Sequence, residues 1–402
     1  MTTQAERIKP KALMLATVAS MIDLFNMDNI AILESLGYDV HVAANFQFGS
    51  VTSRARVDEF RRELIERGIK IHDIPIPRSI TRIKDILLSY RIVKGICGEY
   101  QYKILHCHSP IGGVLARLGA RKIRKEYGAR VIYTAHGFHF YKGAPLKNWL
   151  LYYPLEWLCS IWTDVLITIN KEDYALAQRK MKARQVEYVP GVGVDLSRFA
   201  FRANDRARVR EELGVKADEI MLLSVGEINQ NKNHQIVVRA LAQICNTKVR
   251  YFIVGEGAMK EYLFRLASKV GVAAQVHLLG YRKDIARLLC GADIFCFPSK
   301  REGLPVSLME AMASGLPCIA SQIRGNTDLI QDGLGGYVIS LSSIDGFRAR
   351  IEELVLDNDK RKALGDYNRR HIETYSIANI SSLIRTIYLK EGNLYEGIAN
   401  NQ

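Results

Sequence analysis

The sequence lacks a pattern of paired cysteines. Its seven cysteines are odd in number and scattered, and no two of them form a Cys-x-x-Cys pair. Such a set gives no disulfide framework, which excludes a small disulfide-stabilised secreted domain and favours a reducing cytoplasm. The cysteines stand at positions 97, 107, 159, 245, 290, 296 and 318.

A signal segment and a long hydrophobic run are also missing. Residues 1–7 are polar and the next apolar run is short, so no cleavable signal is expected. The nearest candidate for a membrane span, residues 149–164, is interrupted by Pro154, Glu156 and Asp164, which are costly in hydrocarbon. We therefore expect a protein that is made and kept in the cytoplasm.

The same residues 149–164 contain all three tryptophans of the chain. Lys142 and Lys147 lie just upstream, and tryptophan beside lysine is typical of helices at a membrane interface. Ordinary packing of a core helix explains these residues equally well. Both interpretations stay open at the level of the sequence.

Patterns for a metal or a dinucleotide cofactor are incomplete. His106, Cys107 and His108 are ligand types, but adjacent strand residues point to opposite faces, so the three are not expected to reach one ion. Residues 255–257 (GEG) are only part of the glycine fingerprint for dinucleotides. We predict no metal and no cofactor.

Positive charge is in excess, mainly in the first half of the chain. Residues 1–190 contain 28 Lys and Arg against 18 Asp and Glu, which is +10 of the formal +14. No basic helix interleaved with stacking aromatics and no nucleic-acid module is present, so we expect an anionic membrane surface rather than nucleic acid as partner. The basic clusters are Arg54, Arg56, Arg61 and Arg62, and Arg117, Arg121, Lys122, Arg124 and Lys125.

Short apolar segments alternate with longer helical stretches along the chain, which predicts an α/β fold with parallel sheets in βαβ units. A length of 402 residues with 48% hydrophobic residues fits two domains. The alternation of strand-type and helical segments begins again after residues 190–200, where we expect the domain boundary. Parallel sheets bind ligands at the carboxyl ends of their strands. Segments of strand type are residues 11–16, 40–44, 104–106, 131–133, 165–169 and 220–224.

The most informative stretch is residues 299–311 (SKREGLPVSLMEA), which follows an apolar strand that ends at Pro298. Gly303 and Pro305 permit a tight turn, after which a buried helix is expected. The N–H groups at its start could hold a phosphate beside Glu302, and Glu310, one turn inside, could accept hydrogen bonds from a ribose diol. The alternative is two glutamates on the solvated ends of a surface helix.

This stretch resembles the signature of the retaining glycosyltransferases of family 4, in which a Glu, seven residues and a second Glu lie in the second half of a GT-B fold. In the first half, residues 134–140 (TAHGFHF) and 106–109 (HCHS) are especially similar to enzymes that assemble bacterial exopolysaccharide and capsule repeat units. Further similar segments, in the family's order, are residues 224–234 (SVGEINQNKNH), 252–257 (FIVGEG), 278–285 (LLGYRKDI), 325–330 (GNTDLI) and 332–333 (DG).

The resemblance implies two Rossmann-like domains, 1–190 for the acceptor and 191–376 for the nucleotide sugar. It also implies that a final segment, 377–402, has a helix that returns to the first domain. The catalytic residues would be Glu302, His136 and Lys232, although a core or supporting role for His136 and His139 is the alternative. The donor-binding residues would be Glu310, Lys232, Arg282, Tyr281, Gly303, Leu304, Pro305, Asn229 and Arg301, and those on the acceptor or sugar side His108, His139 and Ser20.

The function implied is metal-independent transfer, with retention, of a sugar from a nucleotide diphosphate donor to a saccharide on polyprenyl diphosphate, at the inner face of the plasma membrane. A UDP-hexose or UDP-N-acetylhexosamine is expected as donor, with GDP-mannose as the alternative. A nucleotide-sugar epimerase of similar fold and a non-catalytic partner in a polysaccharide complex are the competing functions.

Two positions depart from the family. Glu227 follows Gly226 where relatives carry an Arg that clamps the diphosphate, and an acidic side chain there repels the ligand unless it turns away. Either Asn229, Asn231, Arg301 or Arg282 takes over that clamp, or the affinity for the diphosphate is weaker than in relatives. The usual glycine-rich loop after the first strand is replaced by residues 17–23 (TVASMID).

Overall fold

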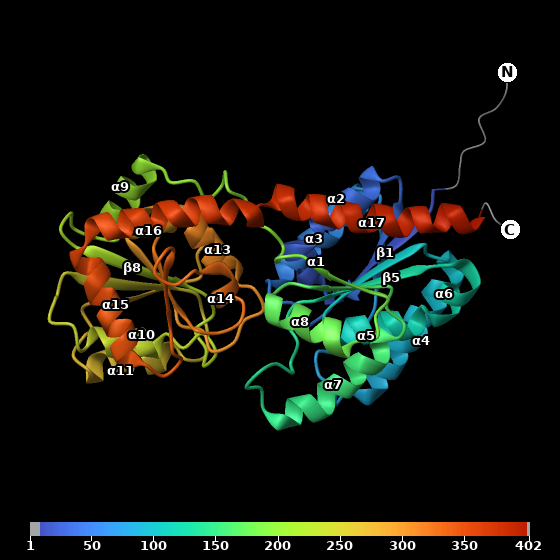
Figure 1. Cartoon of the computed structure of the whole chain (residues 1–402), viewed down its shortest axis with the longest axis horizontal. Coiled ribbons are helices and arrows are strands. Elements are labelled where there is room, and N and C mark those ends of the chain that lie inside the picture. Colours follow the sequence, from blue (N-terminus) through green and yellow to red (C-terminus); the bar gives the residue numbers. More distant parts are fainter. Residues whose placement is uncertain (1–8, 400–402) are drawn as a thin grey trace, which may run out of the picture. The chain divides into compact units, whose positions relative to one another are not determined.

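Each half of the chain forms a parallel β-sheet covered by helices on both faces, which confirms the predicted fold of two Rossmann-like domains (Figure 1). The computed structural model describes residues 9–399, with side chains described up to residue 392. Unit 1 comprises the chain up to Val192 and the segment from Ile380 onward, and unit 2 comprises Gly193–Asn379. The final helix from Ile380 therefore belongs to the first unit.

The sheet of unit 1 has seven strands in the order β3-β2-β1-β4-β5-β6-β7. Strand β4 is buried along its whole length, as expected for a parallel strand with helices on both faces. Strand β4 pairs in parallel with β1 on one side and with β5 on the other. The loops that follow these three strands therefore all leave the same edge of the sheet. The strands are β1 (Lys11–Val18), β2 (Asp39–Asn45), β3 (Lys70–Asp73), β4 (Ile104–His108), β5 (Arg130–Ala135), β6 (Val165–Thr168) and β7 (Gln185–Tyr188).

The helices of unit 1 form two layers with separate cores. Apolar side chains of α1 (Ala19–Phe25), α2 (Met27–Ser35), α3 (Arg54–Glu66) and α17 (Ile377–Ala399) pack on one face, where Ile380, Ile384 and Ile387 belong to the core. In Figure 1 these helices lie on the opposite side of the sheet from α4, α5 and α7. The second layer comprises α4 (Ile83–Tyr100), α5 (Pro110–Gly119), α6 (Arg121–Tyr127), α7 (Leu146–Ser160) and α8 (Lys171–Lys180).

The sheet of unit 2 has six strands in the order β10-β9-β8-β11-β12-β13. They are β8 (Ile220–Val225), β9 (Val249–Val254), β10 (Val276–Gly280), β11 (Ile294–Phe297), β12 (Cys318–Ser321) and β13 (Gly336–Ile339). The helices are α9 (Ala203–Glu212), α10 (Gln235–Leu241), α11 (Lys260–Lys269), α12 (Ile285–Gly291), α13 (Val306–Ala313), α14 (Asn326–Leu329), α15 (Ile344–Leu356) and α16 (Asn358–His371), followed by the 3-10 helix η1 (Ile372–Tyr375).

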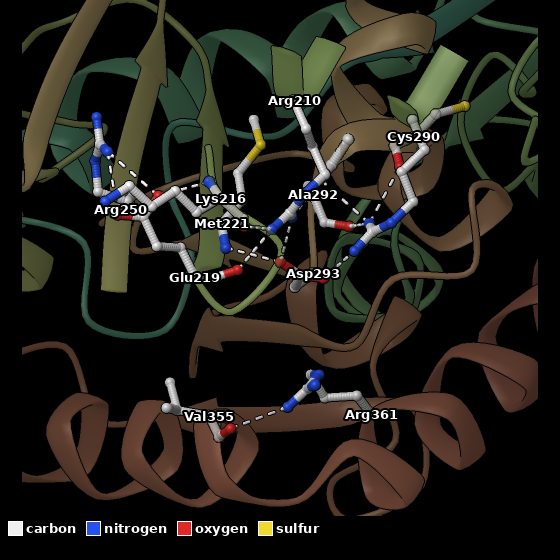
Figure 2. A network of polar contacts seen from close by, with 12 residues as sticks. Arg210, Lys216, Glu219, Met221, Arg250, Cys290, Ala292, Asp293, Val355 and Arg361 are labelled. Atoms are coloured by element: carbon white, nitrogen blue, oxygen red, sulfur yellow. Dashed lines mark hydrogen bonds and ion pairs between the residues drawn. The ribbon is translucent and has the colours of Figure 1, made fainter. Parts of the chain in front are cut away.

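An ion-pair network holds the amino-terminal edge of the sheet in unit 2. Asp293, just before β11, bonds Arg210 at 2.9 Å and accepts from the backbone N–H of Met221 at 2.8 Å (Figure 2). Arg206 bonds the second carboxylate oxygen at 2.6 Å. These charges join α9 to β8 and β11, and we therefore assign them a structural role. The carboxyl ends of the same strands, at the opposite edge, carry the candidate site.

Within residues 9–399, no helix combines the length and the hydropathy that crossing a membrane requires.

Candidate active site

Two neighbouring strands of unit 2 bring Lys232 to Glu302. Strands β8 and β11 are paired, so the loops after them leave the same edge of the sheet. Lys232 Nζ donates to Glu302 Oε1 at 2.8 Å and lies 4.7 Å from the centre of the Phe297 ring. The two side chains are 19% and 15% exposed, so the ion pair is largely shielded while remaining open on one side. This contact joins two of the three predicted catalytic residues.

The loops that carry this ion pair are bonded to each other. Asn229 Oδ1 accepts from the Lys232 backbone N–H at 2.9 Å, which fixes the turn from which the lysine projects. Asn231 donates to the Arg301 carbonyl at 3.0 Å, and the Lys300 N–H donates to the Asn231 carbonyl at 2.7 Å. Asn229 and Asn231 thus shape the backbone around Lys232.

The start of α13 is also held from the loop after β12. Arg324 Nε donates to the Glu302 carbonyl at 3.3 Å, and Arg324 is only 9% exposed. Gly325 has φ +78°, and a Cβ there would lie 2.3 Å from the Gly303 carbonyl oxygen, so the two loops pack without room for a side chain. Sequence reasoning matched the segment from Gly325 to the family but missed Arg324. Arg324 stands three residues after the buried strand β12 and belongs to no motif that was matched.

Glu310 lies inside α13, which begins at Val306 as the sequence predicted from Pro305. Burial raises the pKa of the Glu310 carboxyl to about 7, against a smaller opposing effect of the Arg198 charge. Among residues 9–399 its carboxyl has no hydrogen-bond partner. Sequence reasoning missed Arg198, because it stands more than a hundred residues earlier and belongs to no motif.

The other predicted donor residues are less closely assembled. Tyr281 is 73% exposed. Arg282 bonds Asp284 at 2.7 Å and Glu212 at 2.9 Å, and these bonds raise the pKa of its guanidinium. In the described part of the chain no hydrogen bond or ion pair joins Arg282 to Lys232. The exposed Arg301 contributes its carbonyl to the loop, as described above, while Gly303, Leu304 and Pro305 form the turn before α13.

Glu227 is exposed, and its carboxylate has no partner among residues 9–399. Its carbonyl oxygen accepts from the Asn229 N–H at 2.9 Å. The preceding Gly226 lies under the lysine, since a Cβ there would be 3.0 Å from Lys232 Cε. Glycine at this position therefore gives the Lys232 side chain its path to Glu302.

In unit 1, three histidines of β4 and the end of β5 form a polar row, in which His106 and His108 are buried and His136 is partly exposed. His106 bonds the Tyr388 hydroxyl at 2.6 Å and the Thr134 hydroxyl at 2.8 Å. The His106 and His108 ring centres are 4.2 Å apart, and His108 Nδ1 lies 3.1 Å from His136 Nε2. The row links α17 to the candidate residue His136.

Burial keeps these histidines neutral. It lowers the pKa of His106 to about 3 and that of His136 to about 4, and it lowers the pKa of His108 well below the usual range. At neutral pH each ring therefore carries one N–H donor and one acceptor nitrogen.

Met14 fixes the direction of the bond between His108 and His136. The Met14 sulfur lies 3.2 Å from His108 Nε2, and a thioether can only accept. We therefore assign the proton of His108 to Nε2, which leaves Nδ1 to accept from His136 Nε2. His136 Nδ1 then keeps its lone pair, so His136 is prepared to accept a hydrogen bond from a sugar hydroxyl.

Ser20 and His139 hold neighbouring loops. Ser20 is 2% exposed, and its hydroxyl accepts from the Val51 N–H at 3.1 Å. The His139 ring stacks on Tyr152 of α7 with ring centres 4.5 Å apart, and its carbonyl accepts from Asn148 at 3.0 Å. Their observed contacts are structural, and His139 ties the loop after β5 to α7.

Residues 17–23, which stand where relatives have a glycine-rich loop, form the end of β1 and the start of α1, and the end of β1 is bonded to the start of α5. Thr17 donates from its backbone N–H to the Ser109 hydroxyl at 3.0 Å, and the Gly112 N–H donates to Thr17 Oγ1 at 3.1 Å. Ser109 has φ +64°, an uncommon conformation for a non-glycine residue. Sequence reasoning did not single out Ser109, whose strain is visible only in the backbone.

Comparisons with known proteins agree with the geometry of both units. Residues 205–371 match the family described as Glycosyl transferases group 1, and residues 30–198 match Glycosyltransferase Family 4. EpsD of Bacillus subtilis (strain 168), whose name designates a glycosyltransferase, is 38% identical over 94% of this chain and 96% of its own.

A second relative is the Escherichia coli UDP-Gal:alpha-D-GlcNAc-diphosphoundecaprenol alpha-1,3-galactosyltransferase, 29% identical over 81% of this chain and 85% of its own. The crystal structure of HepE from Anabaena in complex with UDP and glucose superimposes with a TM-score of 0.76. That comparison covers 95% of this chain and 100% of HepE at 18% identity, which supports the fold.

Proposed function

Because the chain belongs to glycosyltransferase family 4 and has its GT-B fold, we propose that it moves a hexose or N-acetylhexosamine from a UDP-linked donor to a saccharide on polyprenyl diphosphate. In this proposal the anomeric configuration is retained and the product belongs to bacterial exopolysaccharide or capsule synthesis. The name of the E. coli relative, which states a UDP-sugar donor and a diphosphoundecaprenol acceptor, supports this donor and acceptor class.

The observation that carries the proposal is the ion pair between Lys232 and Glu302 at 2.8 Å. In our mechanism the ammonium of Lys232 and the N–H groups at the start of α13 stabilise the negative charge that grows on the leaving diphosphate. The Glu302 carboxylate, released from the lysine, stabilises the positive charge that develops on the donor sugar. Lys232 thus opposes the negative charge of the transition state, and Glu302 opposes its positive charge.

The bond changes in this mechanism occur on one face of the sugar. The bond between the anomeric carbon and the phosphate oxygen breaks, and the acceptor oxygen bonds the anomeric carbon. The acceptor's proton passes to the leaving phosphate oxygen, so no enzyme-bound sugar is needed. Glu310 holds the ribose hydroxyls when its carboxyl is ionised, and His136 Nδ1 accepts a hydrogen bond from a sugar hydroxyl.

We further propose that the reaction needs no divalent metal, since Lys232 and the helix start supply the positive charge at the diphosphate. Treatment with EDTA should leave the rate of transfer unchanged, and added Mg²⁺ should not raise it. A rate that falls with EDTA and returns with Mg²⁺ would disprove this part of the proposal.

The main test is nucleotide release from a panel of UDP- and GDP-sugars, with and without lipid-linked saccharide from a bacterial membrane. Release should require one donor and the lipid, and Glu302→Gln should abolish it. Glu261→Gln is the matched control, because Glu261 is exposed on α11, where its side chain is 69% exposed. NMR of the product's anomeric proton then tests retention.

Two results of that test would favour the competing functions. Conversion of the donor to an isomer without any acceptor would indicate an epimerase. Donor binding with no release from any pair would indicate a non-catalytic partner, a function that is supported by the exposed Glu227 in the place of the family's clamping Arg. We place the enzyme at the inner face of the plasma membrane, where a polyprenyl-linked acceptor is available.

A further inference from the structure

Helix α7 turns its apolar face outward. Its one acidic residue, Glu156, points inward, is 7% exposed, and bonds Arg117 at 2.9 Å and the Tyr133 hydroxyl at 3.1 Å. We call the outward apolar side chains the α7 face. They are Leu146 (72% exposed), Leu150 (71%), Leu151 (50%), Leu155 (40%), Trp157 (37%), Leu158 (44%) and, just after the helix, Ile161 (45%).

This arrangement is the reverse of an ordinary surface helix, which buries its apolar stripe and exposes its charges. Leu150 and Leu158 are spaced so that they share one side of the helix with Leu146 and Ile161. Contiguous apolar surface of this extent marks an interaction site. Packing inward is achieved by Trp149, Tyr152 and Tyr153, which contact the core of unit 1.

A basic cluster lies at the far end of the same helix. Trp162, directly after the α7 face, has the Arg121 guanidinium 4.3 Å from its ring centre. Both residues line a pocket of about 630 Å³. The basic cluster is defined as five cations of that pocket: Lys94, Arg121, Lys122, Arg124 and Lys125. The sixth cation that lines the pocket, Arg130, is left out of the cluster because it lies 3.5 Å from the Asp164 carboxylate.

The basic cluster keeps an excess of positive charge. Asp164 is 2% exposed and neutralises Arg124, which it bonds at 2.7 Å. Lys122 reaches Glu126 only at 3.8 Å between two exposed side chains. Lys94 and Lys125 have no ion-pair partner among residues 9–399. Uncompensated cations beside an apolar face attract a surface that is negative outside and apolar inside.

We propose that the α7 face and the basic cluster together dock unit 1 on an anionic lipid bilayer. The leucines and Trp157 enter the boundary between headgroups and acyl chains, and the cations meet lipid phosphates. The choice of a bilayer as occupant rests on this charge complementarity and on the proposed function, in which the acceptor is linked to a lipid.

The contacts of α7 connect this surface to the candidate acceptor residues. Tyr152 stacks on His139, and Asn148 donates to the His139 carbonyl, so the loop that carries His136 and His139 is anchored on the docking helix. A bilayer bound at the α7 face would therefore hold a lipid-linked saccharide near the end of β5. The surface thus accounts for Trp157 and Trp162 and for the second basic cluster of the first half of the chain.

The test is co-flotation of the full chain with phosphatidylcholine vesicles that do or do not contain phosphatidylglycerol. Binding should require phosphatidylglycerol and should weaken with salt, which screens the cations. Leu150→Asp should reduce binding by about tenfold or more, because a leucine loses its place in the apolar layer. Lys125→Glu should reduce it by at least about fivefold.

Matched controls lie in unit 2. Leu356→Asp changes an exposed leucine of α15, and Lys269→Glu changes a lysine in the last turn of α11, as Lys125 is in the last turn of α6. Both controls should float like the wild type. All variants are first checked for unchanged thermal unfolding, and the salt dependence of the wild type supplies a measurement that needs no variant.

Two outcomes would overturn the proposal. One is equal flotation of Leu150→Asp and the wild type; the other is a lipid-free dimer that Leu150→Asp dissociates, which would assign the α7 face to a second copy. An assay with a short-chain, water-soluble acceptor distinguishes a failure of the docking surface from a failure of the proposed transferase function, because such an acceptor does not require binding to a bilayer. If Leu150→Asp loses only docking, this variant should still transfer sugar to the soluble acceptor. If the wild type binds vesicles but transfers sugar to no acceptor, the proposed function is wrong, whereas the proposed docking surface is still supported.

Discussion

The candidate residues of unit 2 carry charges, whereas those of unit 1 are neutral. At the strand ends of unit 2, Lys232 pairs with Glu302, and Glu310 has a carboxyl that ionises near neutral pH. At the corresponding edge of unit 1, burial keeps His108 and His136 uncharged. The same sheet architecture therefore provides two different electrostatic environments.

The difference matches the ligands that the proposed function assigns to each unit. A diphosphate needs compensating positive charge and a developing sugar cation needs a carboxylate, whereas sugar hydroxyls need neutral donors and acceptors of fixed direction. Loops of unit 2 supply the charges of Lys232 and Glu302, and helix α13 supplies the carboxyl of Glu310. Buried side chains of unit 1 supply direction, because Met14 determines which ring nitrogen of His136 remains an acceptor.

Removing the charge of unit 2 should have the largest effect. Lys232→Ala should lower kcat/KM by about 10²–10³-fold, because a preorganised cation at the leaving group is lost. The control is Lys260→Ala, since Lys260 pairs with Glu256 at 3.6 Å but both side chains are about half exposed. Steady-state kinetics of both variants test this, and equal losses would show that Lys232 does not face the diphosphate.

Donor binding should depend on pH through Glu310. Since the pKa of its carboxyl is about 7, the fraction able to accept hydrogen bonds from a ribose rises with pH, by up to about tenfold per unit below that value. The apparent affinity for the donor should rise accordingly in calorimetry. Glu310→Gln should show no such step, and a step that survives in the variant would assign it to another group.

The same group links stability to pH. The folded state keeps the Glu310 proton up to about pH 7, whereas the unfolded chain releases it near the ordinary glutamate pKa of 4.5, so the free energy of unfolding falls as pH rises between these values. Glu310→Gln removes this loss and should unfold at a higher temperature than the wild type at alkaline pH, but not at acid pH.

A smaller effect is expected from the neutral histidines. His136→Ala should lower kcat/KM by roughly fivefold, the value of one neutral hydrogen bond. Because the pKa of His136 is about 4, this loss should be the same throughout neutral and mildly alkaline pH. A loss that changes with pH in this range would mean that His136 works in its charged form.

Met14→Leu tests the tautomer alone. The substitution nearly conserves volume and removes only the sulfur acceptor, so it should cost less than about 1.5 kcal/mol of stability. Nitrogen NMR of the imidazole rings should show His136 protonated on Nε2 in the wild type and a mixture of tautomers in the variant. An unchanged spectrum would show that the sulfur does not set the bond direction.

The smallest effect should be confined to stability. Tyr388→Phe leaves His106 Nδ1 without its 2.6 Å partner and should lower the free energy of unfolding by about 1–3 kcal/mol. Tyr262→Phe is the control, because the Tyr262 hydroxyl bonds Gln235 on the surface. Denaturant unfolding of both variants measures the difference, and equal values would argue against a structural role for this buried bond.

The elements of the fold were readable because buried parallel strands are continuous apolar runs. Residues 104–106 and 131–133 lie within β4 and β5, and residues 220–224 lie within β8. The turn at Gly303 and Pro305 likewise predicted the start of α13 at Val306. Local pattern suffices in such cases because burial on both faces leaves no freedom to alternate polar and apolar residues.

The candidate site was readable only in part. The motifs predicted Lys232 and Glu302 as site residues, but not that the two side chains touch. Their 2.8 Å contact joins positions seventy residues apart, because the pairing of β8 with β11 brings the two loops together. Arg324 and Met14 gave no signal in any motif. Met14 acquires its role from His108 on another strand, and Arg324 from Glu302 in the loop after another strand, and a linear pattern contains neither contact.

The sequence by itself determined the two parallel-sheet units, the glutamate pair around α13 and the family to which they belong, because these depend on local pattern and spacing. Only the tertiary structure decided which nitrogen of His136 is an acceptor, that Glu310 is buried enough to shift its pKa, and that Trp149 faces the core while Trp157 faces outward. These properties depend on what packs around a side chain, and packing partners come from distant parts of the chain.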